Sequence, residues 1–146
     1  KGVHLGVTSA TASNLIDDYE EGTWTAQIIG TTSNPSSDIT LSSARYTKIG
    51  RLVFCQFQFS NVNTTGASGS VRVTGLPFTA ATSYATGNVM TYVRMSFGTS
   101  STNISPYVES TNIKFYQSTN QSGWAEITHN AGTGAYLACT VTYETT

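Results

Sequence analysis

The chain contains little charge. Only 10% of its 146 residues are Asp, Glu, Lys or Arg, and the formal net charge at pH 7 is −1. Proteins that bind nucleic acids neutralise phosphates with clustered Lys and Arg, whereas the seven such residues here are scattered. Long apolar runs are missing too, since none approaches the roughly 18 residues of a membrane-spanning helix. We therefore expect neither a nucleic-acid partner nor insertion into a membrane.

Strong helix formers are scarce, and the chain is rich in Thr, Ser and aromatic residues instead. It contains 25 Thr, 18 Ser, eight Tyr and six Phe. Thr, Tyr and Phe fit the half-buried surface of a β-sheet, so we expect almost no helix. Disordered chains lack aromatic residues and carry high net charge, which excludes disorder here. At this length the chain is expected to fold as one all-β domain.

Short strand-like runs recur along the chain with turn signals between them. No helical crossover separates the runs, so we predict antiparallel pairing in a β-sandwich of the jelly-roll type. We assign residues 22–146 to this domain and residues 1–21 to an extended N-terminal connector from a longer polypeptide. The predicted strands are 23–29, 45–48, 51–60, 70–74, 88–97, 106–109, 112–117, 124–128 and 135–144.

The predicted strand 51–60 has large apolar side chains on both faces. Leu52 and Phe54 lie on one face, and Val53, Cys55 and Phe57 lie on the other. One face can fill the core, while the second needs a cover from a loop, the N-terminal segment or a neighbouring subunit. Because residues 1–21 also lack an evident partner within the chain, we predict a homotrimer with three-fold symmetry.

Two cysteines and two histidines offer little chemistry. Cys55 and Cys139 both lie in strand-like runs and are 84 residues apart in the sequence, so we expect two buried free thiols rather than a disulfide. His4 and His129 are expected to be ordinary surface or subunit-contact residues. No Gly-rich loop precedes a helix to hold a phosphate. We predict no cofactor.

The acidic residues allow two kinds of site. Four carboxylates fall within residues 17–21 and could bind a hard cation such as Ca²⁺, but they lack EF-hand spacing, so a solvated turn or salt bridges between subunits are favoured. Glu109 and Glu126 could form a glycosidase pair, although nothing in the sequence brings them together. No Ser lies in a nucleophile elbow. We therefore predict no metal site, no catalytic residue and no enzyme activity.

Four segments carry a resemblance to a known family. Residues 15–25 (LIDDYEEGTWT) resemble the LDDYEEGTWTP signature of phage tail-fibre and tail-tip C-terminal domains, with Ala26 where that signature has Pro. Residues 44–53 (ARYTKIGRLV), 75–78 (GLPF) and 140–144 (TVTYE) follow in the order that the family shows. The upstream residues 2–6 (GVHLG) are also similar.

The resemblance implies a homotrimeric, non-enzymatic receptor-binding domain at the distal end of a tail fibre. Its expected partner is a bacterial surface glycan or an outer-membrane receptor, and its expected location is the virion. The same module in a prophage or a bacterial chromosome would be an extracellular adhesive fibre. The alternatives are a structural trimerising connector of the fibre and a polysaccharide depolymerase.

The receptor site is predicted in residues 84–134, which contain no segment of the resemblance. A module used on different hosts should keep its framework constant and vary its intervening loops. The candidate residues are Trp124, Tyr107, Tyr116, Asn120 and Gln121, since rings stack on sugars and amides bind sugar hydroxyls. Trp124 follows a polar turn and is either a core residue or an exposed stacking platform. The two tyrosines could equally be half-buried strand residues.

Overall fold

The computed structural model describes residues 3–4, 15–16, 18–82, 85–92, 94–96, 101–119 and 122–146. Strands make up 70% of the structure, and the described residues contain no helix, which confirms the all-β prediction. It follows that these residues include no helix long and apolar enough to cross a membrane.

Each of the nine predicted strands overlaps an observed strand, and the last is reproduced within its predicted limits. In chain order the strands are β1 (Val3–His4), β2 (Leu15–Ile16), β3 (Tyr19–Gly30), β4 (Ile39–Ile49), β5 (Leu52–Val62), β6 (Val71–Thr74), β7 (Ala85–Tyr92), β8 (Met95–Ser96), β9 (Ser101–Glu109), β10 (Asn112–Thr119), β11 (Ala125–Glu126), β12 (Thr128–His129) and β13 (Ala135–Glu144).

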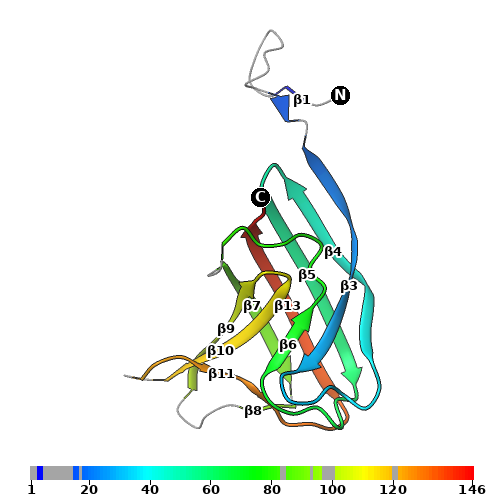
Figure 1. Cartoon of the computed structure of the whole chain (residues 1–146), viewed down its shortest axis with the longest axis vertical. Coiled ribbons are helices and arrows are strands. Elements are labelled where there is room, and N and C mark those ends of the chain that lie inside the picture. Colours follow the sequence, from blue (N-terminus) through cyan, green and yellow to red (C-terminus); the bar gives the residue numbers. More distant parts are fainter. Residues whose placement is uncertain are drawn as a thin grey trace.

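The strands form a closed antiparallel barrel of eight strands, so the prediction of a β-sandwich is wrong. The order around the barrel is β10-β6-β3-β4-β5-β13-β7-β9, and β9 pairs with β10 to close it (Figure 1). A sandwich and a barrel place alternate residues inside in the same way, so local sequence patterns do not separate them. The sheet closes into a barrel because β10 pairs with β6 on one side and with β9 on the other.

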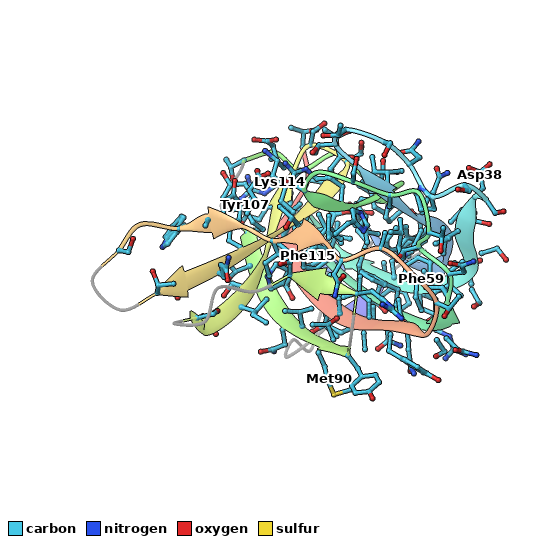
Figure 2. All side chains as sticks on the ribbon, turned by 90° about the horizontal axis from the view of Figure 1, so that it is seen from below. Asp38, Phe59, Met90, Tyr107, Lys114 and Phe115 are labelled. Atoms are coloured by element: carbon cyan, nitrogen blue, oxygen red, sulfur yellow. The ribbon has the colours of Figure 1, made fainter. Side chains whose placement is uncertain are left out.

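The core fills the inside of the barrel with alternate side chains from every strand. On β5, Val53, Cys55, Phe57 and Phe59 are buried and the residues between them are exposed. Phe59 and Phe115 point into the barrel from its two sides, whereas Met90 projects from the outer surface (Figure 2). An eight-stranded barrel has an interior just wide enough to be filled by side chains.

The segments of the resemblance meet at one end of the barrel. Gly22 on β3 pairs with Tyr46 on β4, and a side chain at Gly22 would meet the Tyr46 ring, so the glycine leaves room for that ring. Tyr46 in turn packs edge-on against Phe78 at a centroid distance of 5.3 Å. The Tyr143 hydroxyl donates a hydrogen bond to the Phe78 carbonyl over 2.9 Å. Residues 75–78 therefore close this end of the barrel.

The N-terminal residues that the structure describes are paired. β1 pairs with β2, and Figure 1 shows β1 beyond the end of the barrel. β3 begins at Tyr19, so residues 19–21 of the predicted connector already belong to a barrel strand. Asp18 is also described, and the other residues of the connector lie outside the described residues.

The outer face of β5 carries the second apolar surface that the sequence indicated. Leu52 is 51% exposed and Phe54 is 40% exposed, so no described segment covers them fully. Ile49 pairs directly with Leu52, and Tyr19 pairs with Ile49, which places all four side chains on one face. We call Tyr19, Ile49, Leu52 and Phe54 the apolar face.

Candidate binding groove

The hairpin of β9 and β10 positions two of the predicted site residues. In its antiparallel register Tyr107 lies opposite Lys114 and Ser105 lies opposite Tyr116. Residues at alternate positions share a face, so Tyr107 and Tyr116 both point outward from the barrel. β9, β10 and β11 lie together at one side of the molecule (Figure 1).

Trp124 joins the two tyrosines because β11, which starts at the next residue, pairs with the end of β10. The Tyr116 ring lies 5.5 Å from the Tyr107 ring and 6.3 Å from the Trp124 ring, measured between centroids. Trp124 is 70% exposed, so it is an exposed ring and the alternative of a core residue is wrong. Tyr107 and Tyr116 are half-buried strand residues whose rings nevertheless line an open surface.

The three rings line a groove with a volume of about 210 Å³. The other lining residues were not among the predicted site residues. Two of them, Asn103 and Ser105, lie at alternate positions of β9 before Tyr107, so the strand pattern would have indicated them. Pro106 is fully buried and contributes to the wall of the groove. The lining residues are Thr86, Asn103, Ser105, Pro106, Tyr107, Tyr116, Gln117, Ser118 and Trp124.

A partly buried ion pair holds Tyr116 in place. The Tyr116 hydroxyl donates a hydrogen bond to Glu126 over 3.1 Å, and Arg72 donates to both oxygens of that carboxylate over 2.7 Å. Burial raises the pKa of Glu126, but hydrogen bonds from Ser70 and Arg72 outweigh burial and lower the pKa below its ordinary value. Glu126 is therefore a carboxylate at neutral pH, and its charge is compensated by Arg72.

The charges around the groove are compensated in pairs. Lys114 lies 2.5 Å from Glu109 and sits over the Tyr107 ring, where Figure 2 shows the two side chains close together. Arg94 donates a hydrogen bond to the Thr133 carbonyl over 2.6 Å and does not line the groove. Between residues 83 and 134 the sequence contains no charged residue besides Arg94, Glu109, Lys114 and Glu126.

Other sequence candidates do not assemble into a site. Glu109 lies opposite Asn112 and Glu126 lies opposite Tyr116, four residues along β10, so their backbones are about 13 Å apart along the strand, and each carboxylate is bound to its own cation, Lys114 or Arg72. A glycosidase pair needs about 5–10 Å. The predicted residues Asn120 and Gln121 lie outside the described residues.

Within the acidic cluster, each described carboxylate has a partner. Asp18 forms a salt bridge with Lys48, Glu20 accepts a hydrogen bond from Tyr46, and Glu21 accepts one from Tyr19. Asp17 lies outside the described residues. In the part of the chain that the structure describes, no three His, Cys, Asp or Glu side chains are grouped so that they could hold a metal ion.

The two cysteines and His129 are structural. Cys55 and Cys139 are buried and free, which confirms the prediction of two buried thiols, and burial raises the pKa of each to about 12. Nε2 of His129 lies 3.1 Å from the Ile29 carbonyl, while Nδ1 is buried without a protein partner. The side chain of His4 lies outside the described residues.

Among the candidate sites that the structure describes, only the groove offers an open surface to a ligand. The described charged side chains around it and in the acidic cluster already have partners within the chain. Comparison of the chain with models of known protein families finds no match, and comparison with curated proteins finds no significant match either.

Proposed function

We propose that this chain is the receptor-binding domain at the distal end of a phage or phage-derived tail fibre, and that it binds a bacterial surface glycan without cleaving it. The groove formed by Tyr107, Tyr116 and Trp124 carries the proposal. Exposed aromatic rings bordered by amides and hydroxyls are the chemistry that carbohydrate binding uses. The groove lies within residues 84–134, while the segments of the resemblance are in the barrel framework.

The groove combines an exposed ring with an ordered ring. A ring that is 70% exposed, as Trp124 is, leaves a large apolar area in water, which costs free energy unless a partner covers it. Tyr116 is fixed by Glu126, so part of the surface is ordered before a ligand arrives. Pre-organised surfaces lose less entropy on binding.

Binding without cleavage follows from the carboxylates. Among the described residues, the groove lining contains no Asp or Glu, and Glu126, the carboxylate that contacts one of its rings, has a lowered pKa and a bound Arg72. A general acid for glycoside hydrolysis needs a raised pKa instead. Incubation of the domain with host polysaccharide is expected to release no reducing sugar. Release that Glu126→Gln abolishes would establish a depolymerase.

The central test is the binding of the purified domain to host cells. Trp124→Ala is expected to lose at least about tenfold in affinity, because stacking aromatic residues commonly dominate such interfaces. Tyr92→Ala is the matched control, since Tyr92 is 68% exposed but lies outside the groove. Wild-type binding by Trp124→Ala would refute the proposal and favour a structural connector.

We further propose that the domain acts as a homotrimer, with the apolar face as part of the subunit interface. Four large side chains gather on one face of β3, β4 and β5, and single-copy soluble proteins rarely expose such contiguous apolar surface. At the edge of that face Arg51 is paired with Glu144, so a second copy can cover these two residues without leaving either charge unpaired.

Light scattering tests the assembly. The wild-type domain is expected at three times the 15.5 kDa chain mass, and Leu52→Lys with Phe54→Lys is expected to give a folded monomer. Met90→Lys is the matched control, because Met90 is 73% exposed and lies away from the apolar face. A wild-type mass of 15.5 kDa at micromolar concentration would refute the trimer.

A further inference from the structure

The composition of the groove restricts the charge of what it can bind. The nine described residues that line it include no Lys, Arg, Asp, Glu or His, and the polar groups they contribute are mainly hydroxyls and amides. Hydroxyls and amides both donate and accept hydrogen bonds, so they match the hydroxyls of an uncharged sugar. An anionic sugar would lose hydration in the groove without gaining an opposite charge.

The two cations nearest to the groove are already occupied. Arg72 donates to both oxygens of Glu126, and the Lys114 ammonium lies 2.5 Å from Glu109. A carboxylate or phosphate on the ligand would have to displace one of these partners and leave Glu126 or Glu109 unpaired. Breaking a partly buried ion pair costs more than an exposed pair contributes.

The size of the groove indicates one sugar ring. Its volume of about 210 Å³ is below the roughly 300–1,000 Å³ of pockets that enclose drug-sized ligands. Asn103, Ser105 and Thr86 lie beside the aromatic rings, which places hydrogen-bonding groups along an apolar surface. A pyranose ring matches this arrangement, because it has an apolar C–H face and hydroxyl groups at its edge.

We propose, on the basis of the proposed receptor-binding function, that the groove takes one uncharged pyranose residue of the surface glycan and discriminates against uronic acids, sialic acids and phosphorylated sugars. The C–H face of the sugar stacks on Trp124 and Tyr116. Asn103, Ser105 and Thr86 bind its hydroxyls. Glu126 is a positioning residue, because it holds the Tyr116 ring and does not line the groove.

The chain supplies its own optical probe for this proposal. It contains two tryptophans, Trp24 in the core and Trp124 in the groove, so Trp24→Phe leaves Trp124 as the single tryptophan, at the proposed site. This variant is titrated with the methyl glycosides of glucose, galactose, mannose and rhamnose, and with methyl glucuronide and galacturonide, each up to its solubility limit. A melting curve first checks that the variant is folded.

At least one neutral glycoside is expected to shift the emission of Trp124, and the uronide with the same ring stereochemistry is expected to bind at least about tenfold more weakly. Lys114→Gln is expected to change the neutral affinity by less than about twofold. Cell binding by the wild-type domain should be nearly unchanged between low salt and about 0.5 M NaCl, because no charge pair forms with the ligand.

The outcomes separate this inference from the proposed function. If Trp124→Ala binds cells like the wild type, the proposed function fails and the inference fails with it. If Trp124→Ala loses cell binding, but the uronide binds as well as its neutral counterpart or salt weakens binding severalfold, only the inference is overturned. It is also overturned if cell binding depends on Trp124 while no glycoside of either class shifts the emission.

Discussion

The two tryptophans of this chain occupy opposite environments. Trp24 on β3 is 6% exposed, packs edge-on against Phe57 at 5.8 Å and donates a hydrogen bond to the Arg45 carbonyl. Trp124 is 70% exposed and contacts Tyr116 at the rim of the groove. Trp24 belongs to a segment of the resemblance, and Trp124 belongs to the stretch that contains none.

The difference shows how one residue type serves two purposes. A covered ring contributes its apolar area to the stability of the barrel, whereas an uncovered ring keeps that area for a ligand. A weaker form of this contrast separates Tyr143 at the closed end of the barrel, which is buried, from Tyr107 and Tyr116 in the groove, which are half-buried. Stability and binding are therefore expected to respond to different substitutions.

The largest expected effect comes from substituting each tryptophan with Ala. Trp24→Ala should lower the free energy of unfolding by about 3–5 kcal/mol, because it leaves a cavity in a closed core. Trp124→Ala should change it by no more than about 0.5 kcal/mol. Urea denaturation followed by circular dichroism measures both free energies of unfolding. Equal losses of stability in the two variants would show that Trp124 is as important to the fold as Trp24.

The thiols test how completely the barrel interior is closed. Burial raises the pKa of Cys55 and Cys139 from 9.0 to about 12, so the thiolate fraction at pH 8 falls by roughly a thousandfold. Both cysteines are expected to react with a thiol reagent at least that much more slowly in the native protein than in denaturant. Rapid native labelling of either residue would show that the core opens on the time scale of the assay.

Glu126→Gln weakens the support of the groove without touching its lining. The ion pair with Arg72 is partly exposed, so we expect a loss of about 1 kcal/mol at pH 7. Because the pKa of Glu126 is lowered in the folded state, this contribution is present at neutral pH and is lost as the pH falls through the folded pKa. The melting temperatures of variant and wild type should therefore converge in acid. Glu109→Gln, whose carboxylate is 45% exposed, is the control and should cost less.

The smallest effect is expected at His129, which contacts the end of β3. Burial lowers its pKa below the ordinary value of 6.5, partly offset by the hydrogen bond to Ile29. The unfolded state then takes up a proton first as the pH falls, so stability present above about pH 6.5 decreases in mild acid. His129→Gln keeps a donor for the Ile29 carbonyl and cannot titrate. Its melting temperature should fall less between pH 7 and pH 5 than that of the wild type.

Local sequence patterns were sufficient for the strands, and they indicated three of the rings that line the groove. The alternation of Val53, Cys55, Phe57 and Phe59 specifies a strand with one buried face, and the structure has that strand. Tyr107, Tyr116 and Trp124 were selected as polar-edged rings in a segment without framework motifs, and the structure brings all three to one groove. Thr86 was missed, because its place opposite Tyr107 depends on the pairing of β7 with β9, which no local pattern encodes.

By itself, the sequence determined the all-β composition, the strand positions and the two buried thiols, because strand propensity and period-two burial are properties of neighbouring residues. Only the tertiary structure decided that the sheet closes on itself and that Trp124 is exposed. Closure requires β10 to pair with β6 on one edge and β9 on the other, and the β9 hairpin places Tyr107 beside Tyr116. The β9–β10 hairpin is local, but the β10–β6 pairing joins residues far apart in the chain, such as Asn112 and Thr74, so its energy appears only once the barrel has formed.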